Sequence, residues 1–514
     1  MPVSRTFDRS TMGRALADEE FDVLIVGGGV TGLGVAVDAA SRGLRVALVE
    51  RDDFASGTSS KSSKLVHGGL RYLQQGDVRL VYEALHERQR LYRNAPHLVR
   101  VLPFMIPILT KDGVVSKKIA RALGSALWMY DVTGGWRIGR LHRRARRNKA
   151  LSYMPTMNAE RLASAYVYYD AEADDAGLCL SLARTAAELG AVVINRVRHV
   201  GDRRVELDGR PIDVRARVVV DATGVWNPHV PTRPAKGVHL TVPWAKVRNS
   251  IAVVIPVPKD RRSLFVVPWG PRPDGTFSHT YVGTTDTGYD GPLDDPQCTR
   301  DDIDYVLRAL NASVTTGVTA ADVTGTWAGL RPLVVNDDAT SGRTADLSRR
   351  HLVTTGDDGT ITITGGKLTT YRRMAEDTVD VVLGRLGRRA RCRTKRLRLF
   401  GHDGRRDREI DELIRRDPSL GATLIDGLPY RRADVVHAAR HEMSTSVEDV
   451  LSRRTRALLV DRDGAERAAP EVARLMAPIL GWNTEREATE VAHFVEICEH
   501  ERTAAQLRED ELHA

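Results

Sequence analysis

The segment FDVLIVGGGVTGLGVAVDAASRGLRVALVE, residues 21–50, constrains the fold more than any other part of the sequence. A short apolar run ends in glycines, small residues follow over residues 31–41, and a second apolar run ends at Glu50. Gly27, Gly29 and Gly32 match the G-x-G-x-x-G spacing, which permits a tight turn, backbone approach to a pyrophosphate and helix–strand contact. An acidic residue after the second strand suits a ribose hydroxyl. The segment therefore predicts a dinucleotide-binding unit.

This fingerprint serves both NAD and FAD, and two later segments favour FAD. RVVVDATGVW, residues 217–226, is another buried strand and resembles the strand that returns to the dinucleotide in two-part FAD domains. TITITGGKLTTYRRMAEDTVDVVLGRL, residues 360–386, predicts a strand, a glycine turn and a helix that opens near Leu368. The N-terminus of that helix carries partial positive charge, which would stabilise an anionic reduced flavin. FAD is therefore the expected cofactor.

The remaining pattern predicts an α/β + α protein with three parts. Residues 236–345 are rich in β-branched residues and short turns, which favours an antiparallel-sheet substrate domain. Charged helical patterns dominate beyond residue 395 and predict a helical C-terminal domain. The expected divisions are a two-part, Rossmann-like FAD-binding domain (20–98, 150–235 and 346–390), a basic amphipathic insertion (99–149), the substrate domain (236–345) and the C-terminal domain (395–514).

Composition narrows the class of protein. The chain has 514 residues, too many for one core, and a formal net charge of +9, which favours a negatively charged partner. No window supplies the roughly 18 apolar residues of a membrane-spanning helix, and the first twenty residues lack the apolar core of a signal peptide. The cysteines are far apart and predict no disulfide framework and no metal site: Cys179, Cys298, Cys392 and Cys498. We therefore expect a cytoplasmic protein.

The stretch SSKLVHGGLRYL, residues 62–73, places paired glycines between a histidine and an arginine. If the protein binds FAD, this stretch follows the ribose-binding strand and is expected to run along the flavin ring. Its glycines would allow close backbone approach, while the preceding serines and lysines would contact flavin or phosphates. Arg71 and Tyr72 are expected to open a helix over a cavity for an anionic substrate.

Four stretches together closely resemble FAD-dependent glycerol-3-phosphate dehydrogenases of the membrane-associated, quinone-reducing type. They are SSKLVHGGLRYL, KGVHL (236–240), TWAGLRPL (326–333) and GGKLTTYR (365–372), and EDVLSRRTR (448–456) extends the resemblance into the C-terminal region. The resemblance implies that glycerol 3-phosphate is oxidised to dihydroxyacetone phosphate and that the reduced flavin passes electrons to a membrane quinone.

The resemblance also implies the substrate-binding residues. Arg71, Arg331 and Lys367 would hold the phosphate and hydroxyls, and Tyr72 and Thr370 would add hydroxyl donors. A phosphomonoester carries a charge of about −1.5 to −2 near neutrality, which suits arginine forks.

Oxidation of a secondary alcohol needs hydride transfer from C2 to flavin N5 and a base for the hydroxyl proton. His239 and His67 are the candidate bases, with His239 favoured, and a purely structural histidine is the alternative for either. Asp286 is expected to orient a base or to pair with an arginine. The predicted catalytic group is His239, His67, Arg71, Arg331 and Lys367. The predicted cofactor-binding residues are Gly27, Gly29, Gly32, Glu50, Ser59, Ser60, Ser63, Lys64, His67, Gly68, Gly69, Ala222, Thr223, Gly224, Gly366, Lys367, Leu368 and Thr369.

Residues 99–149 combine apolar stretches with seven Lys/Arg side chains between Arg137 and Lys149. This pairing favours an interfacial element on an anionic membrane, at the inner face of the cell membrane. An internal helix followed by a solvated basic loop is the open alternative.

Several other functions remain open or are disfavoured by the sequence. A glycerol-phosphate oxidase would share the substrate and the flavin but use oxygen, and an amine oxidase would share only the flavin fold. Aromatic residues make up only 5% of the chain, and no stacking platform is apparent, so nucleic acid is not an expected partner. A homodimer is one alternative for the oligomeric state.

Overall fold

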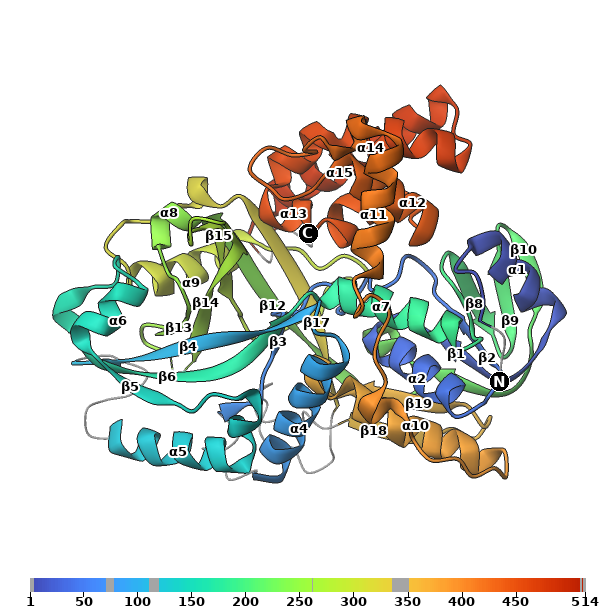
Figure 1. Ribbon diagram of the computed structural model, residues 1–514, viewed down its shortest axis with the longest axis horizontal. Helices are drawn as coiled ribbons and strands as arrows, with labels where there is room; N and C mark the ends of the chain where they lie inside the picture. Colours follow the sequence, from blue (N-terminus) through green and yellow to red (C-terminus); the bar gives the residue numbers. More distant parts are fainter. Residues whose placement is uncertain are drawn as a thin grey trace.

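The computed structural model describes residues 4–70, 78–110, 120–260, 262–334, 351–508 and 511 (Figure 1). Arg71 and Tyr72, which the sequence placed at the substrate cavity, lie outside the described residues.

A six-stranded sheet forms one half of the molecule. Its strands are β1 (Glu20–Val26), β2 (Val46–Val49), β7 (Val192–Ile194), β11 (Arg215–Asp221), β18 (His351–Thr355) and β19 (Ile361–Gly365). The strand order is β18-β19-β11-β1-β2-β7, with β18 antiparallel at one edge and the other pairs parallel. The continuous apolar runs of β1 and β2 fit this sheet because central parallel strands are covered on both faces.

Three helices pack together and against this sheet: α2 (Val30–Ser41), α7 (Asp175–Glu188) and α10 (Tyr371–Arg385). Their apolar residues form one core with the strands. Asp174 begins α7 by accepting a hydrogen bond from the Gly177 amide at 3.1 Å. Beside the sheet lie α1 (Arg9–Asp18) and a small sheet of β8 (Val197–Gly201), β9 (Arg204–Leu207) and β10 (Arg210–Asp213) (Figure 1).

A ten-stranded sheet forms the other half. Its strands are β3 (Leu65–Val66), β4 (Val99–Leu109), β5 (Arg143–Arg146), β6 (Leu162–Ala173), β12 (Thr232–Pro243), β13 (Ala252–Pro256), β14 (Ser263–Pro271), β15 (Phe277–Gly283), β16 (Thr287–Gly288) and β17 (Gly325–Val334). The main path is β16-β12-β15-β14-β13-β4-β6-β3, with β17 paired to β12 and β5 to β6. Most pairs are antiparallel, and β13 and β4 run parallel.

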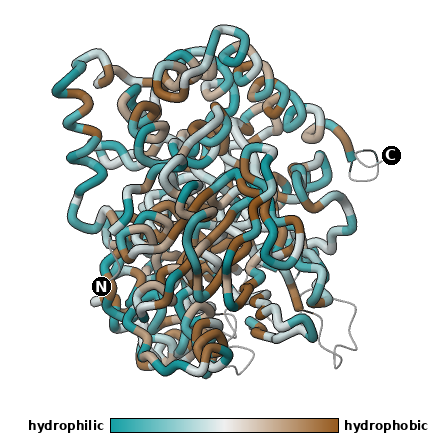
Figure 2. Tube along the Cα trace, turned by 90° about the vertical axis from the view of Figure 1, so that its right-hand side faces the viewer, coloured by the Kyte–Doolittle hydropathy of each residue, from teal (hydrophilic) through white to brown (hydrophobic). Residues whose placement is uncertain are grey.

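Each face of this sheet has its own core. One core includes residues of α6 (Arg147–Tyr153), α8 (Trp244–Val247) and α9 (Arg300–Asn311), and α9 starts at a capping box between Thr299 and Asp302. The other core includes α4 (Val78–Asn94) and α5 (Ala120–Thr133), which lie below the sheet in Figure 1. Figure 2 shows the hydrophobic residues concentrated along the strands at the centre of the molecule.

The C-terminal region is a separate helical layer. It contains α11 (Arg405–Arg416), α12 (Arg432–His441), the π-helical turn η9 (Asp449–Arg454), α13 (Ala457–Val460), α14 (Arg462–Leu480) and α15 (Thr484–Ala504). Buried Phe494 and Cys498 belong to a core of its own. The layer lies above the junction of the two halves (Figure 1). Short 3-10 turns are η1 (Gly135–Ile138), η2 (Ala159–Arg161), η3 (Gly224–Trp226), η4 (Ala320–Asp322), η6 (Leu368–Thr370), η7 (Thr394–Arg396) and η8 (Pro418–Gly421).

The predicted fold class is confirmed, but the strand β4 differs from the prediction for residues 99–149. It pairs with β6 along its length, and most of its residues are buried, so residues 99–109 are no amphipathic membrane element. Strand β6 was expected in the FAD-binding domain and lies instead in the large sheet. The apolar run of β4 suits any buried position, so the sequence did not separate an interior strand from an interfacial one. Among the described residues, no helix is long and apolar enough to cross a membrane.

Candidate cofactor and substrate site

The glycine turn between β1 and α2 brings three backbone segments into contact. Gly27 has a φ of +111°, and a Cβ atom there would lie 2.7 Å from the carbonyl oxygen of Ala222. A Cβ atom on Gly32 would lie 2.0 Å from the carbonyl oxygen of Gly27. A side chain at Gly27 would therefore push the turn away from the end of β11, and one at Gly32 would separate helix α2 from the turn.

A cavity of about 630 Å³ lies at the carboxyl ends of β1, β2, β11 and β19. This edge of a parallel sheet is where doubly wound folds bind nucleotides. The cavity is lined by these predicted cofactor residues: Gly27, Gly29, Glu50, Ser59, Ala222, Thr223, Gly224, Gly366, Lys367 and Leu368.

The donors and acceptors of the cavity fit FAD. The N-terminus of α2 opens at its wall, where the amide of Val30 donates to Ser59 Oγ at 2.9 Å, and its positive end suits a pyrophosphate. Glu50 accepts from the amides of Gly28 and Asp52 at 2.6 and 2.8 Å, which holds its carboxylate at the cavity edge, where a ribose hydroxyl could reach it. Burial raises the pKa of Glu50. The cavity volume is within the range of cofactor sites.

The other predicted cofactor residues do not line this cavity: Gly32, Ser60, Ser63, Lys64, His67, Gly68, Gly69 and Thr369. Lys64 was expected to contact flavin or phosphates, but its Nζ donates to Asp175 Oδ1 at 3.1 Å and to the Ser60 carbonyl at 3.0 Å. The ammonium group also lies 4.9 Å from the centre of the Trp327 ring. Burial lowers the pKa of Lys64 to about 8. Its side chain thus belongs to an internal charge cluster.

The paired glycines after His67 are held by a buried polar network. The amide of Gly68 lies 3.1 Å from Tyr130 Oη and 3.2 Å from Asp170 Oδ1, and both can accept its hydrogen. Tyr130 donates to the same carboxylate oxygen at 2.7 Å, and the fully buried Arg88 pairs with it. The amide of His67 donates to Thr369 Oγ1 at 3.2 Å, which joins this segment to the turn after β19.

His239 lies on β12 with its ring buried in an aromatic and cationic environment. The imidazole stacks on the Trp327 ring with centroids 4.7 Å apart, and its Nε2 lies 2.9 Å from Ser63 Oγ. Burial, with help from Lys64 and Arg331, lowers the pKa of His239 well below its ordinary value. The imidazole is therefore neutral at physiological pH.

Arg331 projects from β17 close to His239. Its guanidinium donates to Asp286 Oδ1 at 3.3 Å and to Thr284 Oγ1 at 3.2 Å. Opposite it, a Cβ atom on Gly237 would lie 2.5 Å from Arg331 Nη2, so the glycine leaves room for the guanidinium. Lys367 lines the cofactor cavity, and Thr370 Oγ1 donates to the Lys367 carbonyl at 3.3 Å.

Comparison with known proteins decides the family. A family model described as FAD dependent oxidoreductase matches residues 22–372, and one described as the C-terminal domain of alpha-glycerophosphate oxidase matches residues 394–487. The chain is 37% identical to glycerol-3-phosphate dehydrogenase 2 of Mycobacterium bovis, covering 98% of this chain and 92% of that protein. This chain belongs to the FAD-dependent glycerol-3-phosphate dehydrogenase family.

Solved structures agree with this family assignment. The glycerol-3-phosphate dehydrogenase from Bacillus halodurans, solved in complex with FAD, superposes with a TM-score of 0.72 at 28% identity, covering 98% of both chains. An L-alpha-glycerophosphate oxidase from Mycoplasma pneumoniae shares the fold at a TM-score of 0.54 and 17% identity, over 73% of this chain and 97% of the oxidase. The predicted cofactor, FAD, is confirmed by the family and by the FAD-bound Bacillus halodurans structure.

Sequence reasoning missed the buried residues that surround the candidate site. Arg88, Tyr130 and Asp170 come from α4, α5 and β6 and meet only in the folded chain. Asp53 and Asp175, which bind C-terminal arginines, were also missed. The cluster of arginines in EDVLSRRTR was an available signal, because arginines that become buried need carboxylate partners.

Proposed function

We propose that this protein oxidises sn-glycerol 3-phosphate to dihydroxyacetone phosphate and delivers the electrons to a membrane quinone. The observation that carries the proposal is the match to glycerol-3-phosphate dehydrogenase 2 of Mycobacterium bovis over nearly the whole of both chains. A buried neutral histidine beside an arginine supports it. Bound FAD supplies a hydride acceptor for the C2 hydrogen of the substrate.

The cationic groups provide the substrate site in this proposal. Arg331 and Lys367 bind the phosphate and hydroxyls together with Arg71, and Tyr72 and Thr370 add hydroxyl donors. The positive charge of Arg331 already lowers the pKa of His239, so its field reaches the position where the proton is taken. The same field attracts a phosphomonoester dianion and stabilises an alkoxide that develops at C2.

His239 is the proposed general base. With its proton on Nε2 donated to Ser63 Oγ, the Nδ1 atom keeps a lone pair. That atom is buried and has no hydrogen-bond partner within the described part of the chain. A neutral imidazole with one open acceptor is ready to take the C2 hydroxyl proton. His67 is the second candidate, because its backbone joins the glycine segment to the turn after β19.

The acceptor is tested by supplying glycerol 3-phosphate to the FAD-loaded protein with a short-chain quinone or with oxygen. Fast quinone reduction with slow hydrogen peroxide formation supports the dehydrogenase. Peroxide formation that keeps pace with substrate oxidation would instead make the protein an oxidase, the activity named for the relative from Mycoplasma pneumoniae.

The outer face of α5 is the proposed contact with the inner face of the cell membrane. Trp128, Met129 and Val132 are 59%, 48% and 71% exposed, and Trp136 and Leu141 follow at 53% and 52%. Large apolar side chains gathered at one exposed site suit the acyl boundary of a bilayer, and the tryptophans suit its interface.

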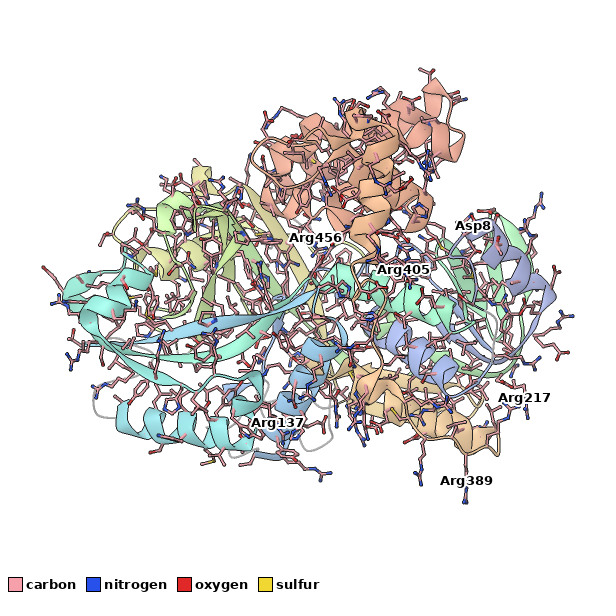
Figure 3. The ribbon with its side chains drawn as sticks, in the orientation of Figure 1. Asp8, Arg137, Arg217, Arg389, Arg405 and Arg456 are labelled. Carbon is pink, nitrogen blue, oxygen red and sulfur yellow. The ribbon has the colours of Figure 1, made fainter. Side chains whose placement is uncertain are left out.

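Basic residues follow this apolar patch directly in the chain. Arg140, Arg143 and Arg144 are exposed, and Arg137 lies at the lower edge of the molecule near α5 (Figure 3). Their charges suit anionic headgroups, and an apolar contact next to a basic one gives two attachment signals.

Flotation with phospholipid vesicles tests this contact. Trp128→Ser with Val132→Ser should lower binding to all vesicles, and Arg140→Gln with Arg144→Gln should lower binding to anionic vesicles only. Val495→Ser, on exposed α15, is the matched control and should float like the wild type. Unchanged flotation of both patch variants would refute this membrane contact.

A further inference from the structure

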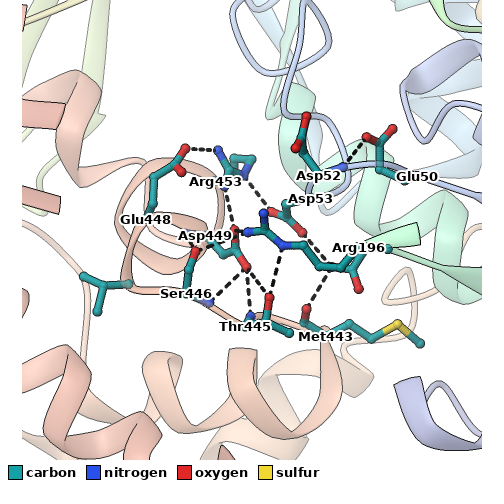
Figure 4. Close-up of polar contacts among 12 residues, drawn as sticks. Glu50, Asp52, Asp53, Arg196, Met443, Thr445, Ser446, Glu448, Asp449 and Arg453 are labelled. Carbon is teal, nitrogen blue, oxygen red and sulfur yellow. Dashed lines mark hydrogen bonds and ion pairs between the residues drawn. The ribbon is translucent and has the colours of Figure 1, made fainter. Parts of the chain in front are cut away.

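The segment 51–60 forms one wall of the FAD cavity and has a second face that turns away from the cofactor. Arg51, Asp52 and residues 55–59 line the cavity. Asp53 does not; its side chain is completely buried against the C-terminal turn η9. Figure 4 shows Asp53 between this turn and the neighbouring Asp52 and Glu50.

Two adjacent arginines of η9 form hydrogen-bonded ion pairs with the Asp53 carboxylate. Arg454 donates from Nη1 to Asp53 Oδ2 at 2.6 Å and from Nη2 to Oδ1 at 2.9 Å. Arg453 donates from Nε to Oδ2 at 2.6 Å, and Asn195 adds an amide donor at 3.1 Å. Burial would raise the pKa of Asp53, but the two guanidinium groups hold it well below its ordinary value. The carboxylate therefore stays charged, and its position is fixed by four donated hydrogen bonds.

A third arginine, Arg456, binds the other end of segment 51–60 at Ser60. Arg456 donates from Nη2 to the Ser60 carbonyl at 2.6 Å and to Asp175 Oδ1 at 2.8 Å. Asp175 also binds Lys64 and the Ser62 hydroxyl, so the chain from residue 60 to residue 64 is tied to the same centre. In Figure 3 Arg456 lies where the C-terminal helices meet the rest of the molecule.

We propose that the C-terminal region retains FAD, with Arg453, Arg454 and Arg456 acting as positioning residues that hold segment 51–60 in its cofactor-binding shape. The proposal rests on FAD as the cofactor and is independent of the substrate and the electron acceptor. Its physical basis is that the segment has little regular structure of its own, so its shape depends on buried ion pairs with a distant part of the chain. If those ion pairs are weakened, ordering segment 51–60 around FAD costs more free energy, and FAD binds less tightly.

Cofactor release from purified holoenzyme tests the proposal. Asp53→Asn removes the negative charge that Arg453 and Arg454 share across the contact, although Arg453 keeps Glu448 and Asp449. Arg454→Lys keeps the positive charge but loses the bidentate hydrogen bonding to Asp53. Both variants should raise the dissociation constant of FAD by about tenfold or more, since each removes part of a buried charged contact.

Glu466→Gln is the matched control. Glu466 pairs with Arg502 and joins α14 to α15 inside the C-terminal region, so its loss weakens the region without removing a contact to segment 51–60. This control should keep wild-type FAD affinity even if its melting temperature falls. Folded Asp53→Asn or Arg454→Lys protein that holds FAD as tightly as the wild type would overturn the proposal.

A measurement on the wild type makes the test independent of how the variants fold. Linkage requires that if the C-terminal arginines favour FAD binding, FAD must in turn stabilise them. Hydrogen exchange should therefore slow on FAD loading in residues 449–456 as well as in residues 51–60. Slower exchange confined to residues 51–60, with residues 449–456 unchanged, would also overturn the proposal.

Discussion

At the scale of single residues, the site depends on buried charges that are satisfied only as groups. Asp170 receives a guanidinium, a phenol and the Gly68 amide at one carboxylate oxygen. Removing one neutral hydrogen-bond partner from such a group should lower the free energy of unfolding less than removing the charged carboxylate. In the first case the remaining charges still neutralise each other.

This difference gives a graded stability prediction. Tyr130→Phe should lower the free energy of unfolding by about 1–2 kcal/mol, since it removes one hydroxyl from the network. Asp170→Asn should cost about 3–5 kcal/mol, because Arg88 is left buried without its counter-charge. Urea denaturation of the two variants measures both values, and equal losses would contradict this account.

The histidine at the proposed site gives a prediction about pH. The pKa of His239 is lowered, so the neutral form persists as pH falls below the ordinary value of 6.5. Substrate-dependent flavin reduction should therefore keep its rate between pH 7 and about 6 and decline only in more acidic solution. A decline centred at or above pH 6.5 would assign the base to another group. His239→Asn should slow reduction across the whole range.

At the scale of elements, helix α15 carries a carboxyl group that opposes folding at high pH. Burial raises the pKa of Glu501 to about 8, although Arg462 and Lys61 act to lower it. Between the ordinary value of 4.5 and about 8, the folded state keeps a proton that the unfolded chain loses. The free energy of unfolding therefore falls as pH rises through this window.

Glu501→Gln should remove that dependence. The variant should gain more melting temperature over the wild type at pH 8 than at pH 5, as measured by thermal denaturation at both values. Glu496→Gln, an exposed change on the same helix, is the control and should show no such difference. An equal effect of Glu501→Gln at both pH values would mean that the carboxyl group titrates normally.

The elements also show which structural features can be predicted from local sequence and which cannot. The turn after β1 could be predicted because its glycines and Glu50 act within one short segment, and Gly27, Gly29 and Glu50 line the cavity. The ion pair of Lys64 could not be predicted because its partner Asp175 is more than a hundred residues away. Strand β4 was misplaced because an apolar run has the same pattern in a sheet interior and at a membrane surface.

At the scale of the whole molecule, the C-terminal helices and the cofactor half share one buried ionic interface. The resemblance to a family indicated both regions and their order, but the interface itself joins Asp53 to residues about 400 positions later. No periodicity or residue spacing predicts the ion pairs between Asp53 and these arginines, because they form only when the C-terminal helices pack against the folded cofactor half. Function assigned to the C-terminal region therefore needed the folded structure.

The most direct test of the central claim is anaerobic mixing of FAD-loaded protein with glycerol 3-phosphate while the absorbance of oxidised flavin is followed. We expect rapid bleaching of the flavin, which a quinone reverses quickly and oxygen reverses slowly. Flavin that stays oxidised in the presence of this substrate would contradict the proposed reaction, even with the cofactor fully bound.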